Sequence, residues 1–233
     1  MEAKTVSVSI VPLTLAGFDA LPKEARRCVY WEVDPEALGP DGLTDTEFEK
    51  EAWLSMVMLE WGSCAQVAVS RSSGVERVVG SAFYAPPLSV PRSRLFPTSP
   101  VSADAVLLST AEIEPGVDGI VLEDLILAVC DDLIRRGVRA VEAFGLVDDG
   151  DELAKCAVCQ CDSTPLIDAQ QLETVGFTVV APHHRYPRLR YELTEGLGWK
   201  AGVERALEQL LAASVAEAAL VGPQREPAPV CRA

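Results

Sequence analysis

The sequence predicts an α+β protein in which helices pack on a sheet. Segments that alternate polar and apolar residues, as strands do, are interleaved with segments whose apolar residues recur at helical spacing. The clearest unit is a strand, a helix and a second strand between Ala103 and Gly145. Because we find neither an internal repeat nor a second apolar core, we expect one α/β/α layered domain.

Composition restricts the class of protein. The chain has 233 residues, 48% of them hydrophobic and 24% charged, which suits a globular domain with a proper core. A formal net charge of −15 argues against binding to nucleic acids or anionic membranes. No window resembles a secretory signal or a membrane helix, and seven cysteines at scattered spacings suggest reduced thiols. We therefore expect a cytoplasmic protein.

The N-terminal third predicts a strand followed by two helices. Residues 5–13 alternate as a strand does, and Asp19 is a suitable N-cap for a short helix. A longer helix is expected from Thr44 or Asp45 to Trp61. The apolar residues that share one face of this helix are Phe48, Ala52, Met56 and Leu59.

A hairpin and a proline-rich segment come next. Residues 65–70 and 77–84 have the pattern of two strands around a Ser-Ser-Gly turn. The segment from Pro86 to Pro100 then contains five prolines, which predicts an extended and stiff surface loop. A connection of this length in a compact domain is often functional.

The central unit combines a phosphate-binding shape with an acidic sequence. A strand to Glu114, a Pro115-Gly116 turn and a helix from Gly119 to Arg136 would present N–H groups to an anion. Between Glu112 and Asp132, however, there are seven acidic residues and no Lys or Arg. The residues expected to form the buried stripe of the helix are Leu122, Leu125, Ile126, Val129 and Leu133.

The C-terminal part begins with residues 148–162, an acidic segment that contains cysteines and is expected to lie outside the regular helices and strands. A short helix opened by Pro165 or Asp168 and closed by Gly176 should follow, and then two strands. The predicted organisation is a domain over residues 1–195, a helical extension packed on it over residues 196–221 and a disordered tail over residues 222–233.

Three stretches that stand out are Arg27-Cys-Val-Tyr-Trp-Glu32, Leu59-Glu-Trp-Gly62 and Arg135-Arg-Gly-Val-Arg-Ala-Val-Glu-Ala-Phe-Gly145. With these and further stretches, the chain resembles the GNAT superfamily of acetyl-CoA-dependent N-acetyltransferases, in particular an actinobacterial subgroup. The resemblance implies a mixed, mostly antiparallel central sheet flanked by helices, with a C-terminal helix added. It also implies transfer of an acetyl group from acetyl-CoA to the amine of a small molecule or a protein.

The resemblance assigns the coenzyme A pyrophosphate to the turn before the central helix, but the residues there differ from the family pattern. Members of the family carry Arg-x-x-Gly-x-Gly or Ala, whereas this chain has Asp118, Val121 and Glu123 at key positions. The residues that match the cofactor loop are Ile113, Asp118, Gly119, Ile120, Val121, Leu122 and Glu123. Like charges about 4 Å apart repel by about 4 kcal/mol at a dielectric of about 20. A non-catalytic binding or regulatory protein, with a homodimer through the C-terminal helix, is therefore the alternative.

The candidate catalytic groups are few. Glu112, near the end of the central strand, is the candidate base for the amine proton, and an ordinary edge-facing carboxylate is its alternative. Many GNAT enzymes place a tyrosine acid four residues before the glycine that ends the penultimate helix, where this chain has Leu172. The general acid is thus unassigned. Trp31 and Glu32 are candidates to line the acceptor pocket, with a core position as the alternative for Trp31.

Two further clusters have both a functional and an ordinary interpretation. Cys156, Cys159 and Cys161 would give three soft zinc ligands, with His183 or His184 as a fourth, although no second Cys-x2-Cys is present and no metal is expected. The basic segment whose arginines are Arg185, Arg188 and Arg190 could receive an anionic ligand. In an acidic chain, we expect these arginines to pair with carboxylates instead.

Overall fold

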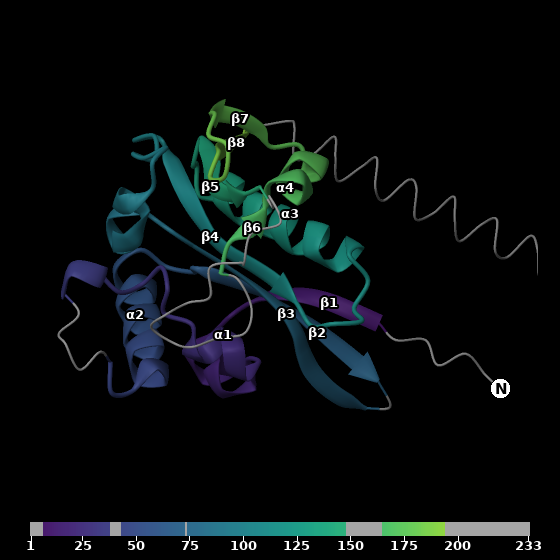
Figure 1. The fold of residues 1–233 in the computed structure, drawn as a ribbon. Helices are drawn as coiled ribbons and strands as arrows, with labels where there is room; N and C mark the ends of the chain where they lie inside the picture. The colour runs from purple at the N-terminus through teal and green to yellow at the C-terminus, as the bar shows by residue number, and fades with distance from the viewer. Residues whose placement is uncertain (1–6, 38–42, 73, 148–164, 194–233) are drawn as a thin grey trace, which may run out of the picture. The chain divides into compact units, whose positions relative to one another are not determined.

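The computed structural model describes residues 7–37, 43–72, 74–147 and 165–193 (Figure 1). They form an eight-stranded sheet whose main order is β1-β2-β3-β4-β5-β8-β7, with β6 paired to β5. The strands are β1 (Ser7–Pro12), β2 (Ala65–Ser72), β3 (Val75–Ala85), β4 (Ala105–Ile113), β5 (Ala140–Leu146), β6 (Ile167–Asp168), β7 (Thr178–Ala181) and β8 (Arg188–Glu192). The β4–β5 and β5–β6 pairs are parallel, and the other pairs are antiparallel. The predicted mixed, mostly antiparallel sheet is confirmed.

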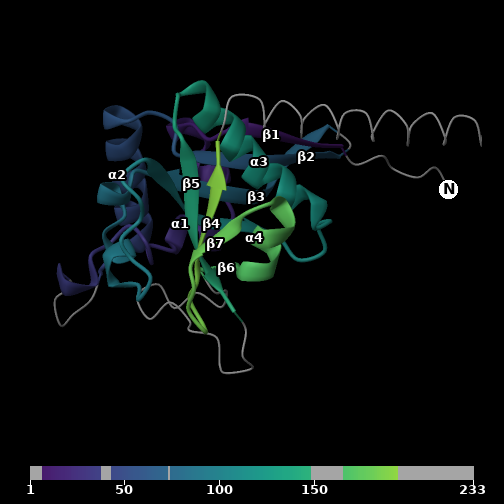
Figure 2. The same cartoon turned by 90° about the horizontal axis from the view of Figure 1, so that it is seen from above.

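Helices cover both faces of this sheet (Figure 2). The α-helices are α1 (Lys23–Arg27), α2 (Thr46–Glu60), α3 (Ile120–Arg135) and α4 (Ala169–Val175). Side chains of α1 and α2 belong to one buried cluster, and those of α3 and α4 to the cluster on the opposite face. The single sheet therefore has a buried apolar cluster on each face, which is the arrangement of one α/β/α layered domain. None of the described helices is long and apolar enough to cross a membrane.

The central β4-α3-β5 unit follows the sequence prediction closely. All five residues of the expected α3 stripe are buried, and the helix begins at Ile120, one residue after the predicted start. Gly116 has a φ of 87°, and the Val117 N–H donates to the Glu114 carbonyl at 3.1 Å, which closes the Pro115-Gly116 turn. Gly137 ends the helix with a φ of 73°.

The first helical segment differs from its prediction. Asp19 is not an N-cap: it lies in a 3-10 helix, Leu15–Ala20, and α1 begins only after Pro22. Proline has a backbone φ that suits a helix start and has no N–H to leave unpaired, so the chain turns into α1 at Pro22.

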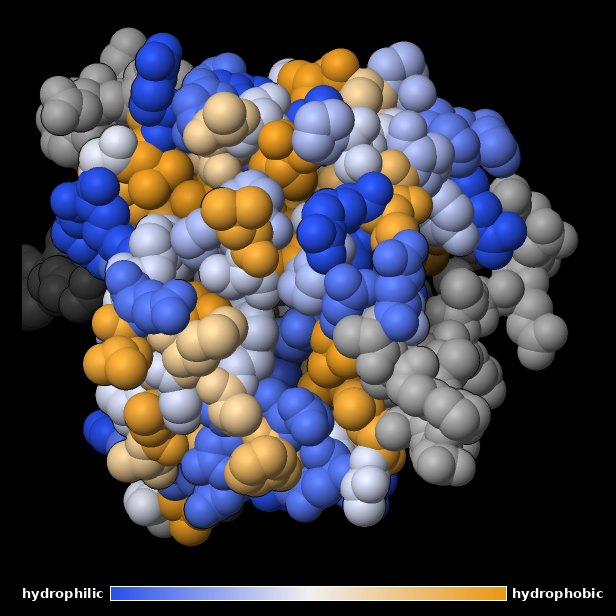
Figure 3. All heavy atoms as spheres, turned by 90° about the vertical axis from the view of Figure 1, so that its left-hand side faces the viewer, coloured by the Kyte–Doolittle hydropathy of each residue, from blue (hydrophilic) through white to orange (hydrophobic). Residues whose placement is uncertain are grey.

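The buried face of α2 was also predicted wrongly. Phe48, Met56 and Leu59 are 64%, 44% and 87% exposed, and hydrophobic side chains reach the surface on this side of the molecule (Figure 3). The residues that α2 buries are Lys50, Trp53, Leu54 and Val57. Two polar anchors fix this rotation, because Lys50 pairs with a buried carboxylate and Trp53 Nε1 donates to the Ser89 carbonyl. Of the two predicted caps, Asp45 is the one that accepts the first free N–H groups of α2.

The proline-rich segment is more ordered and more buried than the extended surface loop that its composition predicts. It forms two 3-10 helices, Pro87–Ser89 and Pro91–Leu95, and buries Val90 and Ser93. Phe96 stacks on two other core rings, those of Trp31 and Phe144. Proline favours tight turns as well as extended backbone, and here apolar contacts decide between them.

The C-terminal part of the described chain agrees with its prediction. Asp168, not Pro165, caps α4 by accepting the Gln171 N–H at 2.9 Å, and Gly176 ends that helix with a φ of 110°. β7 and β8 form the expected antiparallel pair. Residues 148–164 and 194–233 lie outside the described residues, so the predicted helical extension and tail stay predictions.

Candidate functional site

The two parallel strands at the centre of the sheet diverge. β4 and β5 pair only between Ala105–Leu107 and Ala140–Glu142. Farther along, β5 pairs with β6 at Gly145 and Leu146, on the edge opposite the one where β8 lies. Toward their C-terminal ends β4 and β5 are therefore separated, and β6 takes the place beside β5.

A β-bulge at Ser109 changes the direction of β4 just after the strands separate. Phe83 pairs with Thr110 and Tyr84 with Leu108, which leaves Ser109 as the extra residue. The Ser109 hydroxyl donates to the Phe83 carbonyl at 3.0 Å, so the bulge is held by its own side chain. Bulges are frequent beside active sites because they redirect a side chain. Sequence reasoning missed this feature, although a serine within an apolar strand was the available signal.

Glu112 lies beyond the bulge and lines a surface pocket of about 410 Å³. The other residues around this pocket are Pro22, Lys23, Glu24, Arg77, Gly80, Ile113, Glu114 and Pro115. Burial raises the pKa of the Glu112 carboxyl above its ordinary value, while the positive charge of Lys50 opposes the rise. A carboxylate with a raised pKa beside a pocket is suited to accept a proton from a bound molecule.

The predicted cofactor loop forms a turn into α3, and the first four N–H groups of that helix already have acceptors. The Asp118 carboxylate accepts the Ile120 N–H at 3.1 Å. The next three N–H groups, those of Val121, Leu122 and Glu123, donate to the carbonyls of Asp118 and Gly119. Val121 and Leu122 also bury their side chains in the core. The carboxylate of the chain thus occupies the place at the start of α3 where an anion would bind.

Acetyl-CoA therefore does not fit this turn through its diphosphate. A diphosphate would have to displace the Asp118 carboxylate and would meet repulsion from it. Arg77, the cation that lines the neighbouring pocket with Asp118, is already paired with Glu114 at 2.8 Å. The cofactor loop contributes no unpaired cation, and the N–H groups of residues 120–123 already have acceptors. Ile113, the last residue of β4, packs beneath the loop.

The residues proposed for the acceptor pocket lie in the core. Trp31 is 1% exposed, and its Nε1 donates to the Pro165 carbonyl at 3.0 Å. Glu32 forms an ion pair with Lys50, and both side chains are almost fully buried. Leu172, at the position where a tyrosine acid was sought, is fully buried among the apolar residues of α3 and α4. None of these three lines the pocket beside Glu112.

The two arginines of β8 form internal ion pairs, as expected. Arg188 and Arg190 both donate hydrogen bonds to Glu142. Arg190 also donates to both carboxylate oxygens of Asp104, each at 3.0 Å. Burial would raise the pKa of Glu142, but hydrogen bonds from Ser102 and then from the two arginines hold it below its ordinary value. This network ties the end of the proline-rich segment to β5 and β8.

The three cysteines of the possible zinc site lie in a segment that the structure does not describe. Cys156, Cys159 and Cys161 lie outside the described ranges, so their role stays a prediction. His183 uses Nδ1 to accept the N–H groups of Arg185 and Tyr186. Within the described ranges, no group of three or more His, Cys, Asp or Glu side chains is placed to hold a metal ion.

Solved structures with a similar arrangement include three from microorganisms. yncA from Salmonella typhimurium, solved with its cofactor acetyl-CoA, has a TM-score of 0.49 and 18% identity over 81% of this chain and 95% of that one. An N-acetyltransferase from Staphylococcus aureus Mu50 has a TM-score of 0.46 and 12% identity over 81% and 99% of the two chains. The paia N-acetyltransferase from Thermoplasma acidophilum, solved with coenzyme A, has a TM-score of 0.44 and 10% identity over 80% and 99%. No family model and no curated protein sequence matches the chain.

Proposed function

We propose that this chain is a GNAT-type N-acyltransferase that transfers an acetyl group to an amine, with Glu112 as the base. One observation carries the proposal: a partly buried carboxylate with a raised pKa lines a pocket formed by the start of α1, by β3 and by the end of β4. The bulge at Ser109 supports the proposal. Its extra residue reverses which residues of β4 face α1, and Glu112 thereby lies on the side of the sheet that α1 covers. The same proposal places the chain in the actinobacterial GNAT subgroup and in the cytoplasm. A homodimer belongs to the non-catalytic alternative.

The charges around the pocket favour an amine as the acceptor. Glu24, Glu112 and Glu114 contribute three carboxylates, while Lys23 and Arg77 contribute two cations. The Arg77–Glu114 ion pair leaves two carboxylates facing one lysine. An ammonium group is attracted to such a site, and Glu112 would take its proton to give the neutral nitrogen nucleophile. The acceptor is the amine of a small molecule or of a protein.

The donor implied by the family resemblance is acetyl-CoA, held weakly. The occupied N–H groups at the start of α3 remove the usual attraction for the diphosphate, and Asp118 adds repulsion. A second function is supported by the same observation, namely that the chain is a GNAT-type binding or regulatory protein that has lost the cofactor. In that case the pocket beside Glu112 would still bind an amine but would transfer nothing to it.

Calorimetric titration of the purified protein with acetyl-CoA separates these two functions. The transferase predicts measurable heat at millimolar donor and acetylation of at least one amine in a panel of polyamines, amino acids and peptides. Glu112→Gln should lower that rate by about 10²–10⁴-fold, whereas Glu76→Gln, at an exposed carboxylate of β3 that pairs with Arg71 outside the pocket, serves as the matched control. If no heat of binding appears at millimolar acetyl-CoA, the transferase function is ruled out.

A further inference from the structure

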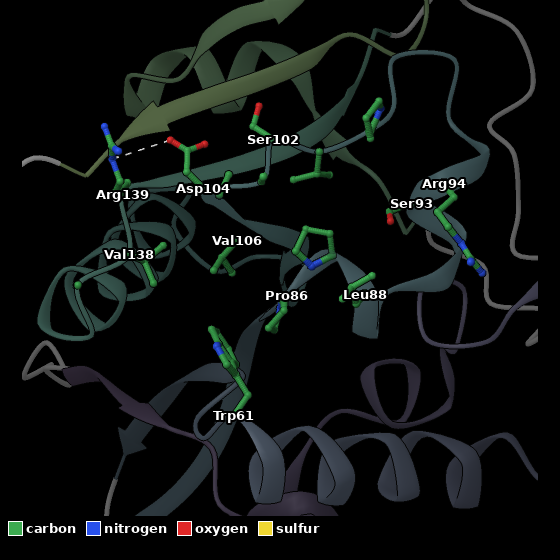
Figure 4. Close-up of a pocket in the computed structure, with 16 residues that line it drawn as sticks. Trp61, Pro86, Leu88, Ser93, Arg94, Ser102, Asp104, Val106, Val138 and Arg139 are labelled. Atoms are coloured by element: carbon green, nitrogen blue, oxygen red, sulfur yellow. Dashed lines mark ion pairs between the residues drawn. The ribbon is translucent and has the colours of Figure 1, made fainter.

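A second, larger cleft lies at the opposite end of β4 from Glu112. It encloses about 800 Å³ between the proline-rich segment, the start of β4 and the start of β5 (Figure 4). The seven residue-to-residue steps from Ala105 to Glu112 span about 23 Å of strand, so this cleft is separate from the amine pocket. Its volume falls within the range of about 300–1,000 Å³ that is usual for small-molecule sites.

The walls of this cleft are apolar and fixed in place. Pro86, Pro87 and Pro100 contribute rigid rings, and Trp61, Leu88, Val106 and Val138 add further apolar surface. The segment that carries Pro100 is tied down on both sides, because Thr98 donates to the Tyr186 carbonyl and Ser102 donates to Glu142. A concave apolar surface that is held in this way is preformed for a ligand with an apolar body.

The charges at the rim leave one loosely held cation. Three charged side chains line the cleft: Arg94, Asp104 and Arg139. Arg94 is paired with Asp34 at 3.0 Å, and both oxygens of Asp104 are gripped by Arg190. Arg139 is 81% exposed, and its contact with Asp104 is 4.0 Å long. Arg139 is therefore the cation of this rim that is least engaged by a carboxylate, and it lies beside an apolar surface.

We propose that this cleft binds a small carboxylate with an apolar body, such as a medium-chain fatty acid. The guanidinium of Arg139 pairs with the carboxylate through two parallel hydrogen bonds, a geometry that arginine favours. The hydrocarbon chain lies against Pro86, Val106 and Val138. The Leu193 N–H donates to the Arg139 carbonyl at 2.8 Å, so the backbone that carries the cation is fixed to the sheet.

The test uses the full-length protein and two ligands that differ only in their head group. 8-Anilino-1-naphthalenesulfonate reports on the cleft by its fluorescence, and decanoate or decan-1-ol competes with it. We expect decanoate to displace the probe at concentrations at least about tenfold lower than decan-1-ol. Arg139→Gln should weaken decanoate about tenfold, while Arg135→Gln, another exposed arginine, should leave it unchanged.

A second variant and the oligomeric state complete the test. Leu88 is 96% exposed, so Leu88→Asp should fold normally yet weaken decanoate at least about tenfold by adding a charge to the apolar wall. Equal displacement by decanoate and decan-1-ol, or unchanged binding by Arg139→Gln, would overturn the proposal. So would a dimer in sedimentation that Leu88→Asp dissociates, because a second copy would then fill the cleft. No outcome depends on acetyl transfer.

Discussion

The Asp118 carboxylate accepts a hydrogen bond from the Ile120 N–H at 3.1 Å, at the start of the helix that the family resemblance associates with coenzyme A. Removing its charge while keeping its shape should therefore change cofactor binding more than stability. We expect Asp118→Asn to raise the affinity for acetyl-CoA about tenfold, equivalent to about 1.4 kcal/mol. The free energy of unfolding should change by less than about 1 kcal/mol, because asparagine can still cap the helix.

The control for that experiment is Asp131→Asn, which removes the same charge in the second half of α3. Calorimetry at two salt concentrations measures both variants, and the gain from Asp118→Asn should shrink at the higher ionic strength. An affinity that rises equally in both variants would indicate an effect of net charge alone, and the assigned role of Asp118 would be wrong.

Glu112 should make the stability of the protein depend on pH. Burial raises its pKa in the folded state above the unfolded value of about 4.3, so the folded protein binds this proton more tightly. Its contribution to stability is therefore present below pH of about 4.3 and is lost as the pH rises through the folded pKa. The glutamine of Glu112→Gln carries no titratable proton, so we expect the variant to gain stability relative to the wild type as the pH rises from about 4.3 toward neutral.

Urea unfolding of both proteins at several pH values measures this difference. The midpoint of Glu112→Gln should move upward relative to that of the wild type as the pH rises. A difference that stays constant across this range would mean that Glu112 titrates alike in the folded and unfolded chains, and the carboxylate would lose its main qualification as the base.

The β4-α3-β5 unit could be predicted from local sequence patterns. The features that the sequence did not predict depend on contacts between residues far apart in the chain. The α3 stripe was predictable because five apolar residues recur at helical spacing, and Glu112 because it ends an apolar strand. The inner face of α2 was not predictable in this way, because it buries a lysine whose partner, Glu32, is 18 residues away in the sequence. The cations beside Glu112 come from α1 and β3, which only the folded sheet brings together.

Removing one partner of the buried Lys50–Glu32 pair should destabilise the protein strongly, whereas neutralising both partners should destabilise it less. Besides pairing with Glu32, the Lys50 Nζ lies 4.1 Å from the centre of the Phe83 ring and 5.7 Å from that of Trp53. Lys50→Met leaves the Glu32 carboxylate buried without its cation, which should destabilise the protein by about 3–5 kcal/mol. Chemical denaturation measures the loss, and Lys23→Met, at an exposed lysine of α1, should change stability by less than about 0.5 kcal/mol.

A double variant separates the loss of the ion pair from the loss of packing. Lys50→Met combined with Glu32→Gln replaces both charges by neutral side chains of similar size. We expect it to recover at least about 1 kcal/mol of the loss caused by Lys50→Met alone. Losses that simply add would show that the two charges do not interact, contrary to the contact between them.

Glu142 should stabilise the protein at neutral pH by joining β5, β8 and the end of the proline-rich segment. It is fully buried, and Arg188, Arg190 and the Ser102 N–H all donate to it. We expect Glu142→Gln to lower the free energy of unfolding by about 3 kcal/mol at pH 7, because two arginines lose their shared anion. Glu192→Gln, which removes an exposed partner of Arg190, should lower it by less than about 1 kcal/mol.

The effect of Glu142→Gln should also fade in acid. Hydrogen bonds hold the folded pKa of Glu142 below its ordinary value despite burial, so its stabilisation is present above the unfolded pKa of about 4.3 and is lost as the pH falls through the folded pKa. Guanidinium unfolding from pH 7 to pH 3 should show the wild type and the variant converging. If the gap is unchanged at pH 3, packing of the side chain, and not its charge, holds these strands together.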